Sequence, residues 1–541
     1  MEQIERDLQT LDASKDSWAR LSVERKIALL EGLKRSIHAV APQWVERAAQ
    51  AKGLKPNSPL AGEEWISGPW AVLYALNRYL RTLRGIAARG VSPVPTPRVR
   101  PDGRSVVDVF PRTIYDRVLL NGISAQVWMQ RGVEPEDVAR EAARLYSLAQ
   151  PEGRVCLVLG AGNIASIPPL DVLYKLLADG SVCMLKMNPV NDYLGPVFEQ
   201  AFKGFVDAGY VRFAYGGADA GAYLCAHDLV GEIHITGSEA THKAIVAEAG
   251  TSKRITSELG NVSPTIVIPG PWSDDDLAFQ AENIATQKAH NAGFNCIAAQ
   301  VLVLPKAWKL SGTLHGRVVD VFEGMEQRPE YYPGAAQRRT RLTPGRTQLR
   351  TTAHVDPAQT DNPAFNTEAF CGVLACVELP GGIEEYTRTA VAFANERLHG
   401  TLGVNLVVHP ATMKTYPSLI DEAISHLHYG CVAVNGWTGI GYFITETPWG
   451  GYPGHTPENA GSGIGVVHNS YLLARTEKSV VHAPFAPFPR SVRSGQFSLL
   501  PRPPWFVTNA MQAEIGRALC DFEVSPSPGR ALRIASLAMR G

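Results

Sequence analysis

The chain has 541 residues, too many for one ordinary hydrophobic core, so we expect two or three domains. Apolar residues make up 45% and charged residues 19%, a composition typical of a globular protein rather than a disordered or fibrous one. Lys plus Arg and Asp plus Glu number 52 each, so no net charge attracts nucleic acid or an acidic membrane, and the expected partner is a small molecule.

The first 90 residues are predicted to be helical, because apolar residues from Trp18 to Ile37 recur at helical spacing between charged ones. The N-terminus has no apolar leader, and no apolar run reaches the roughly 18 residues of a membrane span, which indicates a cytoplasmic protein. The Pro-rich stretch 91–103 is expected to be extended. Strands are predicted at 105–110 and 125–130, and a helix at 134–147.

From residue 154 short apolar runs alternate with helical stretches. The predicted strands are VCLVLG, SVCMLKM, VRFAYGG, GEIHITG and KRITSEL, and one of the helices is expected at 239–249. Such alternation indicates parallel pairing in a doubly wound α/β sheet. A nucleotide is expected to bind at this sheet.

After residue 264 the alternation is less regular. Strands are expected at 301–305, 372–379, 403–410 and 431–436, and helices near 273–290, 383–396 and 411–427. Residues 322–364 are rich in Arg, Pro, Gln and Thr and predict a long irregular segment. The chain after 482 is Pro- and aromatic-rich and ends in a basic helical tail.

The loop after the first strand of the alternating region contains Gly160-x-Gly162-x-x-Ala165, which resembles a dinucleotide fingerprint. That fingerprint depends on an acidic residue at the end of the next strand, which accepts hydrogen bonds from a ribose. Here the strand ends in Lys186, a cation that cannot accept them. A tight turn without a ligand is therefore an equally good interpretation.

Gly237 and Ser238 stand at the start of the helix predicted for 239–249, where free backbone N–H groups form a natural anion site. A plain N-cap serine explains the same pattern equally well. Just upstream, Gly216 to Gly221 forms another flexible turn beside a helix.

Glu258 lies in a mostly apolar segment, and Cys296 follows it in a segment of small residues. Such a pair can act as a general base and a nucleophile. The eight cysteines contain no C-x-x-C pair and no zinc-ligand spacing, so no metal site is predicted. Cysteines in apolar runs are most simply small buried side chains.

Taken in order, these motifs resemble those of the aldehyde dehydrogenase superfamily from about residue 18 to about residue 480. The matching positions are Asn163, Lys186, Gly217, Gly221, Thr236-Gly237-Ser238, Glu258-Leu-Gly260, Ser263-Pro264, Asn291-x-Gly293-x-x-Cys296, Glu368-x-Phe370 and Pro448-Trp-Gly-Gly451. The resemblance implies an α/β fold with a Rossmann-type cofactor domain, an α/β catalytic domain and a small β oligomerisation element.

The resemblance also implies catalytic roles. Cys296 attacks an aldehyde to form a thiohemiacetal, whose oxyanion is held by the Asn163 amide and the Cys296 backbone N–H. Hydride transfer leaves a thioester on Cys296. Glu258 is the general base for the thiol, for the hydrolytic water, or for both in turn, and its uncharged neighbours fit a raised carboxyl pKa.

The implied cofactor is NAD or NADP. Lys186 is expected to bind the adenosine ribose, Glu368 the nicotinamide ribose, and Phe370 to flank the nicotinamide, with the pyrophosphate near Ser238. Pro189 stands where NAD-preferring relatives commonly carry a Glu, so the choice between the two cofactors is open. The complete expected cofactor set is Lys186, Gly217, Gly221, Gly237, Ser238, Leu259, Glu368 and Phe370.

The domain boundaries follow from the resemblance. Residues 1–103 and 151–262 are assigned to the cofactor domain, 104–150 and 465–485 to the oligomerisation element, and 263–464 to the catalytic domain. Residues 486–541 form a C-terminal extension that covers a subunit contact, closes the substrate entrance, or is a surface addition. A homodimer or homotetramer without nucleic-acid or membrane partners is expected.

Two alternatives to aldehyde oxidation remain open from the sequence. In an acyl-transferring reductase, coenzyme A instead of water cleaves the thioester. Glu258 favours hydrolysis, whereas KMNPVND and the short segment after Cys296 differ from the common hydrolytic members. An inactive scaffold of the same fold is disfavoured because Cys296, Glu258 and Asn163 are all present.

Overall fold

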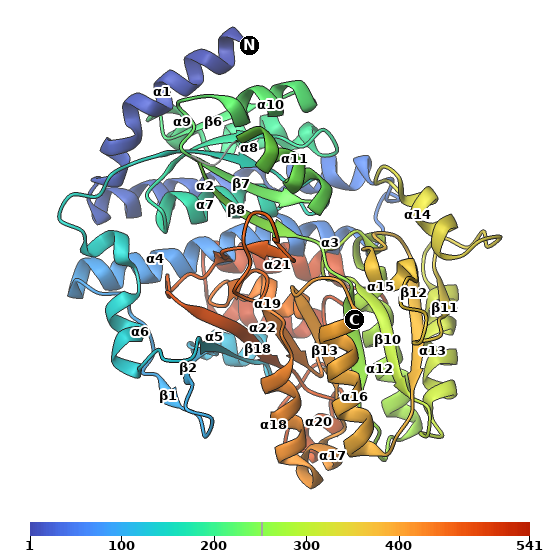
Figure 1. Ribbon diagram of the computed structural model, residues 1–541. Helices are drawn as coiled ribbons and strands as arrows, with labels where there is room; N and C mark the ends of the chain where they lie inside the picture. The colour runs from blue at the N-terminus through green and yellow to red at the C-terminus, as the bar shows by residue number, and fades with distance from the viewer. Residues whose placement is uncertain (250–252) are drawn as a thin grey trace.

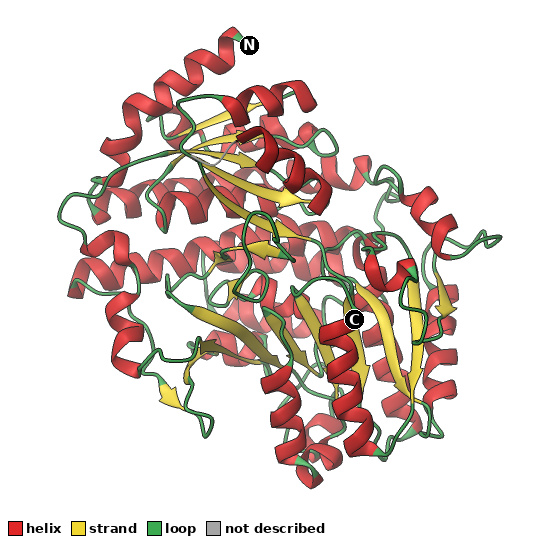
Figure 2. Cartoon of the chain, in the orientation of Figure 1, coloured by secondary structure: helices red, strands yellow, loops and turns green. Residues whose placement is uncertain are grey.

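A computed structural model describes residues 1–249 and 253–541. Two principal β-sheets lie one above the other, and helices flank both (Figures 1 and 2). The first has six strands in the order β16-β8-β7-β4-β5-β6, and the second has ten in the order β1-β2-β3-β18-β14-β13-β9-β10-β12-β11. The predicted α/β fold class is confirmed.

The first sheet is formed by the alternating region. Its parallel strands are β4 (Val155–Leu159), β5 (Val182–Lys186), β6 (Val211–Ala214), β7 (Glu232–Gly237) and β8 (Arg254–Leu259), and the short β16 (Gly463–Ile464) joins antiparallel to β8. The helices between them are α7 (Ile167–Leu177), α8 (Gly195–Ala201), α9 (Lys203–Asp207), α10 (Ala218–Ala226) and α11 (Glu239–Ala249). Central strands β4 and β5 are almost fully buried, as parallel strands covered on both faces should be.

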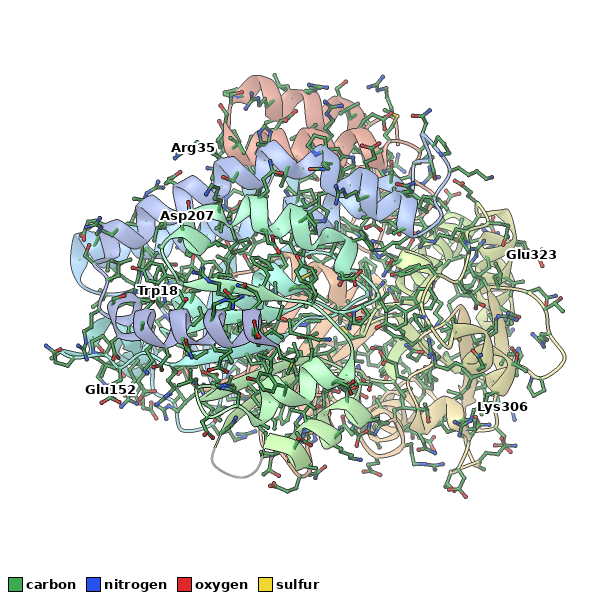
Figure 3. All side chains as sticks on the ribbon, turned by 90° about the horizontal axis from the view of Figure 1, so that it is seen from above. Trp18, Arg35, Glu152, Asp207, Lys306 and Glu323 are labelled. Carbon is green, nitrogen blue, oxygen red and sulfur yellow. The ribbon has the colours of Figure 1, made fainter. Side chains whose placement is uncertain are left out.

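The N-terminal region is helical, as predicted. Its elements are α1 (Glu2–Ala19), α2 (Val23–Ala51), α3 (Ala61–Trp65), a π-helical turn at Ile66–Trp70 and α4 (Ala71–Arg89). Trp18 near the end of α1 is fully buried, and its indole N–H donates to the carbonyl oxygen of Leu176 at 2.9 Å (Figure 3). This contact attaches α1 to α7 of the first sheet.

The second sheet combines parallel and antiparallel strands. Its parallel part is β9 (Ser263–Val267), β10 (Ala299–Pro305), β11 (Thr351–His354), β12 (Val373–Leu379), β13 (Gly403–Val407) and β14 (Cys431–Val434). Strand β18 (Thr476–His482) runs parallel to β14, and β3 (Ser124–Met129), β2 (Ser105–Phe110) and β1 (Arg98–Val99) continue antiparallel from it. Strands β2, β3 and β18, which lie in the ranges assigned to the oligomerisation element, therefore extend the second sheet of their own chain.

Helices cover the second sheet and connect its strands. They are α12 (Asp274–Ala289), α13 (Ser311–Gly324), α16 (Ile383–Arg397), α17 (Pro410–Thr415), α18 (Pro417–His426) and α19 (Thr438–Phe443). The helix expected at 411–427 is divided in two because Pro417 begins the second part. Similarly, the helix expected at 134–147 is α6 (Pro135–Glu141) followed by a 3-10 turn at Arg144–Ser147.

The prediction of an irregular segment at 322–364 is wrong in part. Helix α14 (Ala335–Leu342), edge strand β11 and the short α15 (Pro363–Asn366) lie within it. Strand β11 pairs parallel with β12 from Thr351 to His354. Helix α14 has little apolar periodicity, since Ala335 is its one buried residue. Tertiary contacts therefore decide the structure of this segment.

The C-terminal extension folds onto the N-terminal helices. It contains α20 (Arg490–Arg493), α21 (Gln512–Val524) and α22 (Pro528–Ala538). The last two form a small core with Tyr115 and Leu119 of α5 (Ile114–Leu119). Gly516 faces α3 so closely that a Cβ added there would lie 2.5 Å from the Cβ of Trp65. The extension is thus packed into the molecule rather than loosely attached.

We predict that Gly516→Ala lowers the free energy of unfolding by about 1–3 kcal/mol, because the added methyl group must displace α21 from Trp65. Gly529→Ala in α22 is the matched control, since an added Cβ there meets no atom within 4 Å. Urea unfolding and limited proteolysis of the two variants make the comparison. Equal stability of the two would contradict the tight packing.

Candidate functional site

One cavity of about 930 Å³ lies between the two sheets. The first sheet contributes the carboxyl ends of its strands, including Lys186 of β5 and Gly237 of β7. The second contributes residues just before its strands begin, such as Cys296 before β10. The cavity brings together every predicted site residue: Asn163, Lys186, Gly217, Gly221, Gly237, Ser238, Glu258, Leu259, Cys296, Glu368 and Phe370.

The loop from β4 to α7 carries Asn163 into this cavity. A Cβ at Gly162 would lie 2.7 Å from Asn188 Oδ1, so only glycine permits this close approach of the loop to its neighbour. The Asn163 Nδ2 group donates one hydrogen bond to the carbonyl oxygen of Phe294 at 2.9 Å. Since an amide group has two N–H donors, a second one remains for a ligand in the cavity.

Cys296 follows α12 and a 3-10 turn at His290–Gly293. Asn291 and Ala292 in that turn have positive φ values of 53° and 57°, an unusual backbone that holds the following residues against the cavity. Cys296 is partly exposed, whereas the other seven cysteines are buried. Burial, followed by the nearby Glu368 and Glu258 carboxyls, raises the pKa of the Cys296 thiol.

Glu258 projects from β8 and is 6% exposed. Neither of its carboxyl oxygens has a hydrogen-bond partner among the residues that the structure describes. Burial, with a smaller contribution from the charge of Asp171, raises its pKa well above the usual value. A buried, unpartnered carboxyl beside a thiol can accept a proton when substrate or water reaches the cavity.

The far part of the cavity is lined by small residues. A Cβ placed on Gly217, Gly221 or Gly237 would meet no atom within 4 Å, so this region has room for an extended ligand. Ser238 Oγ accepts a hydrogen bond from the backbone N–H of Thr241 at 3.2 Å, which makes it an N-cap of α11. Ser238 also lines the cavity, and an anion site at this residue stays a prediction.

Glu368 and Phe370 stand on the opposite side of the cavity, before β12. Glu368 packs directly over Gly260, where a side chain would clash with its carboxyl group. Burial raises the pKa of Glu368 to about 8, and its Oε1 atom has no hydrogen-bond partner in the described chain. Phe370 has a φ of 39°, and its carbonyl oxygen accepts hydrogen bonds from the Arg338 guanidinium.

Several cavity residues were not singled out from the sequence: Asp171, Tyr332, Arg338 and Tyr442. Tyr332 and Arg338 come from the segment predicted to be irregular. No local sequence pattern identifies Tyr332 and Arg338, because the tertiary packing of α14 and β12 places them at the cavity. Asp171 lies on an apolar helix, where a lone acid was a detectable signal.

Within residues 1–249 and 253–541, no group of three His, Cys, Asp or Glu side chains is arranged to hold a metal ion. Over the same residues, none of the helices combines the length and the apolar character that crossing a membrane requires.

The sequence of residues 124–318 matches the model of the aldehyde dehydrogenase family. A segment is 30% identical over 165 residues to aldehyde dehydrogenase LUC3 of Fusarium sp, which is 30% of this chain and 33% of the relative. Another is 32% identical over 124 residues to 4-trimethylaminobutyraldehyde dehydrogenase A of Danio rerio, covering 23% of this chain and 24% of the relative. The matched segments thus span a third or less of these curated relatives.

Solved structures resemble the chain over nearly its whole length. An aldehyde dehydrogenase variant from Pseudomonas syringae, solved with NAD+ and octanal, has a TM-score of 0.61 and 17% identity over 90% of each chain. Gamma-glutamyl-gamma-aminobutyraldehyde dehydrogenase from Burkholderia cenocepacia has a TM-score of 0.60 and 18% identity over 89% of each chain. An NADP-dependent enzyme from E. coli has a TM-score of 0.59 and 14% identity, covering 89% of this chain and 90% of the other. Residues 124–318 thus match the aldehyde dehydrogenase family, and the chain shares the fold of solved aldehyde dehydrogenases over 89–90% of its length.

Proposed function

We propose that the protein oxidises an aldehyde to its carboxylic acid with NAD or NADP as hydride acceptor. The observation that carries this proposal is one cavity in which Cys296, Glu258 and Asn163 meet, although they come from three distant parts of the chain. A nucleophile, a base and an oxyanion donor are the groups that such a reaction requires. The match of residues 124–318 to the aldehyde dehydrogenase family supports the assignment.

The first half of the reaction takes place on Cys296. Its sulfur attacks the carbonyl carbon, the thiol proton passes to Glu258, and the carbonyl oxygen becomes an oxyanion. The free N–H of the Asn163 amide and the Cys296 backbone N–H stabilise that oxyanion, and losing one such donor typically costs about 3 kcal/mol of transition-state stabilisation. Departure of the hydride then restores the carbonyl and leaves a thioester on Cys296.

The second half of the reaction is hydrolysis. Glu258 first releases the thiol proton to solvent and then accepts a proton from water. The resulting hydroxide attacks the thioester carbon, the carbon–sulfur bond breaks, the carboxylic acid leaves, and the sulfur takes up the proton held by Glu258. Because the pKa of Glu258 is raised by burial, its base form increases with pH through that raised pKa. Its place in the cavity with Cys296 favours water over a thiol such as coenzyme A as the acyl acceptor.

The cavity residues fit a nicotinamide dinucleotide, which supplies the hydride acceptor when bound. The open space over Gly217, Gly221 and Gly237 suits its pyrophosphate, with Ser238 and Leu259 beside it. Lys186 would donate hydrogen bonds to the adenosine ribose. Glu368, with an unpartnered oxygen, would accept them from the nicotinamide ribose, and Phe370 would flank the ring.

Assembly into a homodimer or homotetramer and a cytoplasmic location are part of the same proposal. All eight cysteines are free thiols, which fits a reducing compartment. Light scattering of the purified protein would measure the subunit number, and a monomer at micromolar concentration would contradict the assembly.

Cys296→Ala is expected to reduce aldehyde oxidation by several orders of magnitude, because no thioester can form. Binding of the reduced cofactor, measured by its fluorescence, should remain within twofold of wild type. Cys520→Ala, a buried thiol of the C-terminal extension, is the control and should retain activity. Robust oxidation by the Cys296 variant would eliminate the proposed chemistry.

Glu258→Gln is expected to give one burst of reduced cofactor, slower than in wild type because the thiol lacks its base. The steady rate that follows should be lower on the order of 100-fold, because thioester hydrolysis lacks the same base. Stopped-flow absorbance at several pH values separates the two phases. In wild type the hydrolytic rate should rise with pH through the raised pKa of Glu258, and this rise should be absent in the variant. Unimpaired steady-state turnover would contradict the base role.

A panel of aldehydes differing in chain length and polarity, assayed with NAD and NADP and with and without coenzyme A, tests the overall assignment. We expect oxidation that is independent of coenzyme A, with carboxylic acid as product. Strict dependence on coenzyme A would indicate acyl transfer. No activity under any condition would indicate a scaffold.

A further inference from the structure

A buried group of polar and charged side chains lies behind the Asn163 loop. We call it the ion network and define it as Lys52, Glu63, Glu64, Arg328 and Tyr331. The two carboxylates are each 1% exposed, Lys52 is 4% exposed and Arg328 is 7% exposed. Arg328 and Tyr331 belong to the segment 322–364, which the sequence predicts to be irregular, and the proposed chemistry uses none of the five residues.

The charges of the ion network are paired. Lys52 Nζ lies 2.8 Å from Glu64 Oε1, and Arg328 Nη1 lies 2.7 Å from Glu63 Oε2. Removing these charges from water costs free energy, so a buried ion pair adds little net stability to a fold. Two complete buried ion pairs at one place therefore indicate that the neighbouring backbone must keep a defined geometry.

The ion network holds the backbone at Asn163. The carbonyl oxygen of Asn163 accepts hydrogen bonds from Lys52 Nζ at 3.2 Å and from the Tyr331 hydroxyl at 3.0 Å. The side-chain amide of Asn291 donates a third at 3.1 Å. Three donors on one carbonyl oxygen fix the residue whose amide faces the cavity.

The same network holds the turn before Cys296. Lys52 Nζ donates to Asn291 Oδ1 at 3.0 Å, and the single proton of the Tyr331 hydroxyl is shared between Asn291 Oδ1 and the Asn163 carbonyl oxygen, each 3.0 Å away. The Asn291 backbone N–H donates to Glu63 Oε2 at 2.9 Å. Arg328 Nη2 donates to the Ala289 carbonyl oxygen at 2.9 Å. Positive φ values in this turn are unfavourable for residues other than glycine. Such a backbone persists when several surrounding contacts hold it in one conformation.

The two held segments meet at one atom. The carbonyl oxygen of Phe294 accepts hydrogen bonds from Asn163 Nδ2 at 2.9 Å and from Asn291 Nδ2 at 3.0 Å. We infer that the ion network consists of positioning residues that set the separation between the Asn163 amide and the Cys296 sulfur. This inference rests on the proposed function for its catalytic consequence.

The most selective test is Tyr331→Phe, which removes only the hydroxyl group that bonds to both segments. A misplacement of about 1 Å at reacting groups can lower rates by up to 100-fold, and we expect the burst rate of hydride transfer to fall about tenfold. Cofactor affinity, measured by fluorescence, should stay within twofold of wild type. A burst rate equal to that of wild type would overturn the inference.

Tyr386→Phe is the matched control. Tyr386 is fully buried, whereas Tyr331 is partly buried, and the Tyr386 hydroxyl donates to the Val303 carbonyl oxygen at 3.0 Å, within the core of the second sheet. The two variants should lower the melting temperature by similar amounts, but only Tyr331→Phe should slow the burst. Equal slowing in both would show that the effect is loss of stability and would overturn the inference.

A second measurement does not depend on aldehyde oxidation. Alkylation of Cys296 by iodoacetamide, followed by peptide mass spectrometry, should be slower in Tyr331→Phe than in wild type because the turn no longer presents the sulfur to the cavity. An equal or faster rate would overturn the inference. If wild type oxidises no aldehyde but the alkylation difference remains, the proposed function fails and the positioning role stands.

Discussion

Desolvation of ionisable groups in the cavity is the constraint on which the rest of the site depends. Glu258 is buried and Cys296 is only partly exposed, and desolvation raises the pKa of both groups. A thiol with a raised pKa keeps its proton until a carbonyl group arrives, and a carboxylate with a raised pKa is a stronger base for accepting that proton. The protein must therefore keep this region closed and apolar while still admitting ligands from the far part of the cavity.

The two sheets solve this problem by their relative arrangement. The carboxyl ends of β4, β5, β7 and β8 face the beginnings of β9, β10, β12 and β13. Backbone groups at strand ends are not needed for sheet pairing, so residues there are free to bind ligands. In the proposed mechanism the first sheet supplies the base and most of the cofactor contacts, and the second supplies the nucleophile together with Glu368 and Phe370.

The predicted part of the site follows from local signals in order along the chain. Alternating apolar runs located β4 through β8, and the catalytic and cofactor residues were then placed by motif order at the ends of those strands. By contrast, Arg328, Tyr331, Tyr332 and Arg338 lie in a segment without periodicity, and their contributions depend on long-range packing. The C-terminal extension was likewise recognised as helical, but its contact with α3 through Gly516 required the folded chain.

The loop with Gly160 and Gly162 illustrates the difference between what the sequence determines and what the tertiary structure decides. The sequence by itself determined the α/β alternation, the absence of an acid at Lys186, and the identities of Asn163, Glu258 and Cys296, because these are properties of spacing and residue type. Only the tertiary structure decided that Gly162 permits close approach to Asn188 and that Asn163 faces the cavity. It also decided that the ion network, whose residues are distant from Asn163 in the sequence, holds Asn163 in place. The physical reason is that buried ion pairs and close backbone contacts join segments hundreds of residues apart, and no local pattern encodes their meeting.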